Sequence, residues 1–251
     1  MHRLLFTADD FGLTDGVCAG IVEARRNGVV ARTSAMVCAP GAIERLRVWA
    51  PKFPGRIGIH LQLTDGRPCL DPPRVSSLVT ADGEFPREPL VTWPFEKAEV
   101  ALEWRAQIAA LRGLGVEISH LDTHQHVHCQ HNELFETYIG LAREYNLPAR
   151  TIPGWNKSLR AAGVRSADHC ETSFYCDDPT LSMLSRAIIH GKALTPIGGL
   201  IEMMCHPGYV TEELAAVDSY VRQREQELEV LTNRKLVPRL AKLAVQVVEQ
   251  E

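Results

Sequence analysis

The chain has 251 residues, 45% of them hydrophobic, and a formal net charge of −4 at pH 7. A chain of this length can bury one large core, and α/β barrels of this size fold as one unit, so a single domain over residues 1–251 is expected. The weakly acidic balance, without a basic stretch, argues against nucleic acid as a partner. The apolar runs are far too short to cross a membrane, and no signal-peptide pattern opens the sequence.

Seven cysteines are present, and no two of them form a C-x-x-C pair. An odd count without such a pair fits neither a disulfide framework nor a zinc knuckle. We therefore expect reduced thiols and a cytoplasmic protein.

Short apolar runs of strand length alternate with segments of helical periodicity along the chain. Strands are expected at residues 3–8, 29–37, 56–59, 117–121, 148–152 and 199–205. Helices are expected at residues 16–27, 42–50, 96–114, 133–145, 214–231 and 235–249. Alternation of this kind predicts a parallel sheet, open or closed into a barrel. The proline-rich segment 68–94 predicts a loop insertion over one rim of the sheet, in the manner of a lid or a substrate loop.

Polar residues directly follow several of the predicted strands. Asp9 and Asp10 close the first strand, His60 closes the third, and His206 follows the last. Folds with parallel strands place active residues at the carboxyl ends of those strands, so these side chains should share one rim. Carboxylates and imidazoles from separate strands are the ligands of a mononuclear divalent-metal site.

The densest group of histidines follows the strand predicted at 117–121, in the run HLDTHQHVH from His120 to His128. If this segment is extended, its even-numbered residues share one face and line one pocket. Metal ligation, orientation of a carboxylate and lining of the pocket are all open roles for these imidazoles. The residues on that face are His120, Asp122, His124, His126 and His128.

Each of these signals also has a plain structural interpretation. Adjacent aspartates commonly cap a turn, a lone histidine after a strand is often a satisfied structural residue, and His-Pro-Gly is an ordinary turn sequence. Their coincidence at strand ends favours function: one aspartate would ligate a metal, the other would act on water, and His206 would serve as a general acid. The sequence contains no G-x-S-x-G, G-x-x-x-x-G-K or H-E-x-x-H motif.

Distinctive motifs are spread along nearly the whole chain. They are ADDFGL from Ala8, RNGVV from Arg26, GIH from Gly58, LTDGRP from Leu63, HLDTHQHVH from His120, EMMCHPGY from Glu202, and the late residues Tyr220, Arg224, Glu225, Glu227 and Leu228. Together they make the chain similar to the YdjC-like, or ChbG-type, carbohydrate deacetylases. Thr123 stands where serine is more usual, and the segment 168–178 has no counterpart in the family pattern.

The resemblance implies a distorted (β/α) barrel of the polysaccharide-deacetylase, or NodB-like, kind. It implies one divalent metal ion held by Asp10, His60 and His124. It also implies that Asp9 is the general base and that His206 is the general acid or an oxyanion partner. The resemblance favours Mg²⁺, whereas two imidazoles and one carboxylate also suit Zn²⁺ or another transition metal.

The same resemblance gives the expected reaction, which is removal of an N-acetyl group from an acetylated amino sugar. Diacetylchitobiose and related N-acetylglucosaminyl compounds are the expected substrates, and Asp122, His126 and His128 are expected to touch substrate or to orient the ligands. Two alternatives remain open: another metal-dependent hydrolase, such as a phosphoesterase or an amidohydrolase, and a non-catalytic sugar-binding relative. A monomer and a homodimer are both compatible with the sequence.

Overall fold

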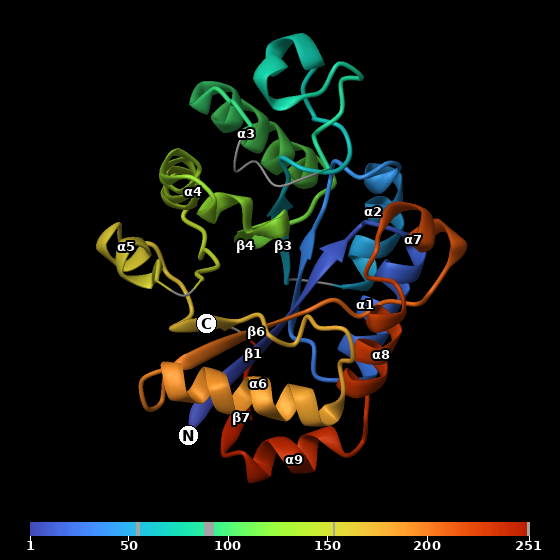
Figure 1. Ribbon diagram of the computed structural model, residues 1–251, viewed down its shortest axis with the longest axis vertical. Helices are drawn as coiled ribbons and strands as arrows, with labels where there is room; N and C mark the ends of the chain where they lie inside the picture. Colours follow the sequence, from blue (N-terminus) through green and yellow to red (C-terminus); the bar gives the residue numbers. More distant parts are fainter. Residues whose placement is uncertain (54–55, 88–92, 153, 250–251) are drawn as a thin grey trace.

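The computed structural model describes residues 1–53, 56–87, 93–152 and 154–249. Its strands form one curved sheet in the order β4-β3-β2-β1-β6-β5, with β7 paired to the start of β1, and every pairing in the sheet is parallel (Figure 1). The sheet curls into a distorted, incomplete (β/α) barrel, as the sequence predicts. The strands are β1 (His2–Phe11), β2 (Arg32–Ala35), β3 (Ile57–Leu61), β4 (Ile118–Thr123), β5 (His169–Glu171), β6 (Leu200–Cys205) and β7 (Val245–Val247).

Helices surround the sheet on its outer side (Figure 1). Several of them start at a threonine whose hydroxyl caps the first turn; Thr14, for example, accepts a hydrogen bond from the backbone N–H of Val17. The helices are α1 (Asp15–Asn27), α2 (Ala42–Trp49), α3 (Lys97–Gly113), α4 (Asn132–Glu144), α5 (Asn156–Ala161), α6 (Leu181–Leu194), α7 (Glu212–Val217), α8 (Arg222–Leu231) and α9 (Leu236–Lys242).

Strand β1 is the centre of the core. It pairs with β2 along one edge and with β6 along the other, and its residues from Leu4 onward are buried. This position explains why the sequence LLF from Leu4 to Phe6 is continuously apolar instead of alternating. This buried strand therefore positions Asp9 and Asp10 near its carboxyl end.

Two predicted elements differ from the structure for local reasons. The strand expected at 148–152 is reduced to one bridge between Ala149 and Leu121, because Pro148 has no N–H with which to extend the ladder. The helix expected at 214–231 is broken into α7 and α8. Asp218 interrupts it, since its carboxylate accepts a hydrogen bond from the backbone N–H of Tyr220 at 2.9 Å and so holds a turn.

The C-terminal region also differs from the prediction. The helix expected at 235–249 ends early, at Lys242, because Ala244 adopts a positive φ of 52° and the chain then enters β7. No element was expected between residues 169 and 194, where the structure has β5 and α6. Strand β5 has only three residues, which is too short to show a periodicity.

The insertion predicted at 68–94 lies partly outside the described residues. Its described part contains two short 3₁₀ helices, η2 (Pro72–Arg74) and η3 (Ser76–Leu78). Val75, Leu78 and Phe85 are buried in the main core, so this part of the segment is attached to the barrel. Within the described ranges, no helix combines the length and the apolar character needed to span a bilayer.

Candidate active site

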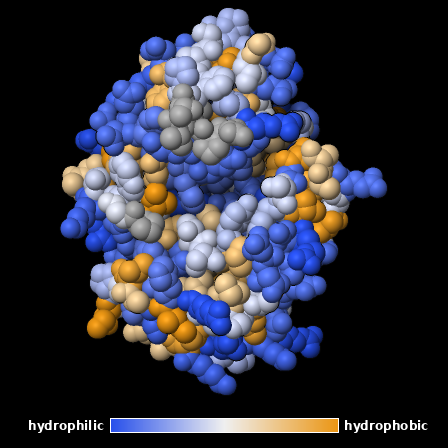
Figure 2. All heavy atoms as spheres, viewed as in Figure 1, coloured by the Kyte–Doolittle hydropathy of each residue, from blue (hydrophilic) through white to orange (hydrophobic). Residues whose placement is uncertain are grey.

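A cavity of about 370 Å³ opens where the strands end. Side chains from β1, β3, β4 and the segment after β6 meet in it, among them Asp10, His60 and His206. Figure 2 shows this face of the molecule hollowed near its centre, with hydrophilic residues in the depression. The carboxyl ends of the strands therefore bring together residues that are up to about two hundred positions apart in sequence.

A bulge at the end of β1 turns both aspartates toward this cavity. The register between β1 and β2 shifts between Ala8 and Phe11, and Asp10 has a positive φ of 67°. In a regular strand two successive side chains would point to opposite faces, whereas a bulge re-aims one of them. Both Asp9 and Asp10 consequently line the cavity, and each is only 2% exposed.

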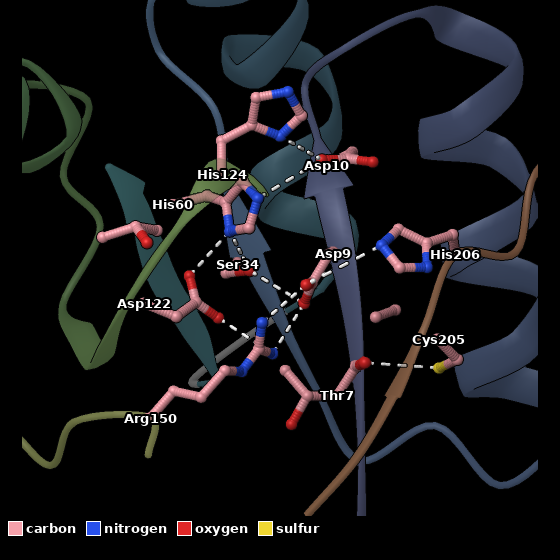
Figure 3. Close-up of polar contacts among 12 residues, drawn as sticks. Thr7, Asp9, Asp10, Ser34, His60, Asp122, His124, Arg150, Cys205 and His206 are labelled. Atoms are coloured by element: carbon pink, nitrogen blue, oxygen red, sulfur yellow. Dashed lines mark hydrogen bonds and ion pairs between the residues drawn. The ribbon is translucent and has the colours of Figure 1, made fainter. Parts of the chain in front are cut away.

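Asp10, His60 and His124 form a compact group of three donors (Figure 3). Oδ1 of Asp10 lies 3.4 Å from Nε2 of His60 and 3.3 Å from Nδ1 of His124. The other oxygen of Asp10, Oδ2, accepts a hydrogen bond from the Arg224 guanidinium at 2.6 Å. Oδ1 is buried and has no hydrogen-bond partner. An orphaned carboxylate oxygen that faces two imidazole nitrogens fits a divalent cation, so the donor set that the sequence predicts is suited to a metal.

The His60 ring is fixed from behind by Asp122. Its Nδ1 lies 2.7 Å from Oδ1 of Asp122 and 3.1 Å from the hydroxyl of Ser34. A carboxylate in this position orients a ligating imidazole and makes its other nitrogen more basic. Burial lowers the pKa of His60, but the carboxylates around it, Asp122 first, outweigh burial and raise that pKa to about 10. Without a metal, His60 is therefore protonated at neutral pH.

Asp9 is held by a buried arginine that the sequence did not single out. Arg150 donates two hydrogen bonds to the Asp9 carboxylate, at 2.6 and 2.7 Å (Figure 3). It also contacts Asp122 at 3.0 Å and Glu202 at 2.8 Å. Burial raises the pKa of Asp9, but Arg150 outweighs it and holds this pKa well below the usual range. Asp9 is thus ionised and fixed in orientation, and it does not take part in the three-donor group around Asp10.

His206 lies on the opposite side of Asp9 from Arg150 (Figure 3). Its Nε2 is 3.9 Å from Oδ2 of Asp9, and its backbone N–H donates to Glu227 at 2.6 Å. Glu227 also accepts a hydrogen bond from the hydroxyl of Tyr220 at 2.7 Å. Burial lowers the pKa of His206 to about 4, so its imidazole is neutral at rest and can accept a proton.

The extended conformation assumed for residues 120–128 is wrong beyond Thr123. Strand β4 ends there, and a kinked 3₁₀ helix, η5 (His124–Cys129), follows, with positive φ at Gln125 and His126. The turn separates the two later histidines, because His126 lines the cavity whereas the His128 ring stacks on Tyr138 at 4.3 Å. His120 stays on β4, fully buried beside Gly58 and away from the cavity lining.

Three buried charged residues that build the site were not assigned a role from the sequence. They are Arg150, Arg224 and Glu227. Arg224 and Glu227 lie in the charged helix α8, which looks like a solvated surface, yet they are 3% and 0% exposed. The sequence feature that could have identified Arg224 and Glu227 as site residues is their place among the late residues of the family motif. Arg150 had no comparable signal, because its partner Asp9 is 141 residues away.

The arrangement can be compared with known proteins. The family model described as YdjC-like protein matches residues 3–242. The chain belongs to the YdjC-like family. A carbohydrate deacetylase of Thermoanaerobacter pseudethanolicus is 34% identical over 242 residues, which are 94% of this chain and 93% of that protein.

Solved structures agree with this family assignment. A protein from Enterococcus faecalis V583 superposes with a TM-score of 0.87 at 30% identity, covering 98% of this chain and 97% of its own. A family 4 carbohydrate esterase from Streptomyces lividans has a TM-score of 0.50 at 12% identity, covering 98% of this chain and 91% of its own, and shows likeness of fold alone. The YdjC-like chain therefore has the polysaccharide-deacetylase, or NodB-like, barrel that the sequence predicts.

Proposed function

We propose that this YdjC-like protein is a metal-dependent hydrolase that removes an N-acetyl group from an acetylated amino sugar such as diacetylchitobiose. The observation that carries the proposal is the pair of neighbouring aspartates in different settings. Asp10 faces two imidazoles with a free oxygen, whereas Asp9 is held by Arg150 beside His206. One carboxylate is thus placed to ligate and the other to move a proton, and both line the same cavity.

The proposed reaction moves one proton from water to the departing amine. A divalent ion held by Asp10, His60 and His124 would polarise the acetyl carbonyl and lower the pKa of a nearby water. Asp9 accepts the proton of the attacking water, because it is ionised and fixed by Arg150. It passes the proton to the neutral His206, 3.9 Å away, which delivers it to the amine nitrogen as the C–N bond breaks. Acetate and a free amino sugar leave.

The metal, the compartment and the oligomer belong to the same proposal. Two imidazoles and a carboxylate suit Zn²⁺, Co²⁺ or Mn²⁺, while family resemblance favours Mg²⁺. All seven cysteines are free thiols, which supports a reducing compartment such as the cytoplasm. The proposed reaction is compatible with a monomer and with a homodimer.

A two-metal phosphoesterase is the main rival. It would need a second group of free donors near the first, and Asp9, His60 and Asp122 do lie close together. Arg150 already binds both of these aspartates, however, at 2.6 and 3.0 Å. A guanidinium at that place supplies the positive charge that a second cation would supply, so a one-metal reaction is favoured.

The direct test is acetate release from a panel of acetylated amino sugars, with nitrophenyl phosphate as the rival's substrate. We expect acetate in equal amount to new free amine, and loss of both after chelation. Phosphate release without acetate would overturn the proposal, and binding of sugar without release would favour a non-catalytic relative.

A further inference from the structure

Tyr175 is an aromatic side chain on the wall of the cavity, next to the histidine proposed to serve the amine. Of the described residues that line the cavity, it alone carries a phenyl-type ring. Its ring stacks on Tyr220, with centroids 4.1 Å apart and planes 29° apart. It also makes a T-shaped contact with the His206 ring, with the two ring centroids 5.0 Å apart. Tyr175 is 48% exposed although Tyr220 stacks on its ring, so part of this residue remains accessible to a ligand.

The turn that carries Tyr175 is anchored on both sides. Phe174 is fully buried, and the backbone N–H of Ser173 donates to Glu171 at 3.0 Å. On the far side, the carbonyl oxygen of Cys176 lies 3.3 Å from the hydroxyl of Tyr220, which shares its single proton between this oxygen and Glu227. A ring held in this way loses little conformational freedom on binding, which favours its use as a binding surface.

The chemistry around the ring selects the ligand. Most of the other side chains that line the cavity are charged or imidazole groups, which bind polar groups, and the apolar ones are Leu13, Met36, Met204 and Val217. A pyranose ring is polar at its rim but presents a face of C–H groups, and such a face packs on an aromatic ring, whose surface carries partial negative charge. An amide nitrogen placed at His206 would put the ring that bears it within reach of Tyr175.

We propose that Tyr175, supported by Tyr220, forms a stacking subsite for the pyranose ring that carries the scissile acetamide. This inference rests on the proposed function for the identity of the sugar, but the stacking can be measured without turnover. Tyr175 is then a specificity-determining residue, which selects cyclic sugars over small acetylated compounds. The segment 168–178, for which the family pattern offered no counterpart, thereby acquires a role.

The binding test uses cellobiose, a disaccharide of the same ring shape that has no acetyl group to lose. In saturation-transfer NMR with the wild-type protein, we expect the axial hydrogens on one ring face to receive more magnetisation than those on the other. Tyr175→Ala should remove that difference, and Tyr175→Phe should keep it. The matched control is Tyr145→Ala, which removes a tyrosine that packs against Arg112 and lies outside the cavity lining. Absence of any bias between faces in the wild type would overturn the proposal.

The kinetic test compares a sugar with a small ester. Tyr175→Ala should raise KM for diacetylchitobiose about 3- to 10-fold, the size of one aromatic contact, with little change in kcat. Hydrolysis of methyl acetate, followed by acetate release, should stay at the wild-type rate, since this small ester has no ring that could stack on Tyr175. Equal losses on both substrates would show a structural role for Tyr175 and reject the subsite. If the wild type shows the NMR bias but releases no acetate, the proposed deacetylation fails while the subsite stands.

Discussion

The described part of the chain contains two clusters with the same donor set, two imidazoles and one carboxylate, and they differ in what the carboxylate already binds. Asp10, His60 and His124 meet at the strand ends, where Oδ1 of Asp10 has no hydrogen-bond partner. The second cluster lies between β5 and α6 and consists of His169, Glu171 and His190. Its third donor, His190, is exposed, whereas His124 of the first cluster is only partly exposed.

Both carboxylate oxygens of Glu171, in the second cluster, have hydrogen-bond partners. Oε1 of Glu171 accepts from the backbone N–H of Ser173 at 3.0 Å, and Oε2 lies 2.7 Å from Nδ1 of His190. His190 is largely exposed, and its side chain can move into solvent. A satisfied carboxylate gains little from a cation, whereas a buried and unsatisfied one gains much. The contrast teaches that ligand identity is not enough to define a metal site; an unmet hydrogen-bonding need is also required.

The largest effect is expected when one histidine is removed from each cluster and the bound metal is compared. His124→Ala should abolish both bound metal and acetate release, because one of the three donors is lost from the Asp10 cluster. His190→Ala should leave metal content and turnover at the wild-type level. Elemental analysis of both variants, purified alike, checks this. Metal retained in His124→Ala, or lost in His190→Ala, would reverse the assignment.

The next largest effect is expected for Asp9→Asn, which distinguishes proton transfer by Asp9 from metal binding by Asp10. Asp9→Asn should keep the metal but lower kcat about 10²- to 10⁴-fold, the usual contribution of an acid–base group. The change also weakens a buried ion pair with Arg150, so the variant should be less stable by up to about 3 kcal/mol. Thermal unfolding and steady-state kinetics measure the two effects separately. Turnover near the wild-type rate would remove Asp9 from the mechanism.

A smaller and more selective effect is expected at His206. His206→Ala should slow amide substrates about 10²-fold, because an amine leaves poorly unless it is protonated. Nitrophenyl acetate should be much less affected, since its leaving group needs no proton. Equal losses on both substrates would indicate oxyanion stabilisation instead, and the acid would then be sought at His126.

The smallest effect concerns the pH dependence of stability in the metal-free protein. His60 has its pKa raised from 6.5 to about 10 by the surrounding carboxylates. Its protonated form therefore stabilises the fold fully below pH 6.5, and this contribution disappears as pH rises from 6.5 to 10. We expect the melting temperature to fall over that range, and to fall less in His60→Gln. The same slope in both proteins would show that His60 is not protonated in the fold.

Much of the fold and of the candidate site can be predicted from the sequence, and the features that cannot be predicted have physical causes. Strand β1 and the residues Asp9 and Asp10 were predictable because a strand buried on both faces leaves an uninterrupted apolar run that ends in polar residues. The convergence of Asp10 with His60 and His124 followed from the rule that parallel strands end at one rim.

The conformation after β4 was not predictable in the same way. Two consecutive residues, Gln125 and His126, have positive φ and turn the chain. Neither residue type predicts this backbone conformation. The buried arginines were missed for another reason, since their partners come from distant parts of the chain. An isolated Arg150 next to a short apolar run, and an Arg224 within a charged helix, are both typical of solvated surfaces. Only tertiary packing distinguishes them.

We propose that one divalent ion, held at Asp10, His60 and His124, is required for deacetylation by this chain. The most direct measurement strips the protein with a chelator and then follows acetate release from diacetylchitobiose while Mg²⁺, Zn²⁺, Co²⁺ or Mn²⁺ is added, in parallel with measured binding. We predict that activity returns in proportion to bound metal and stops rising at one ion per chain. Full activity in the stripped protein, or activity that requires two ions per chain, would contradict the account.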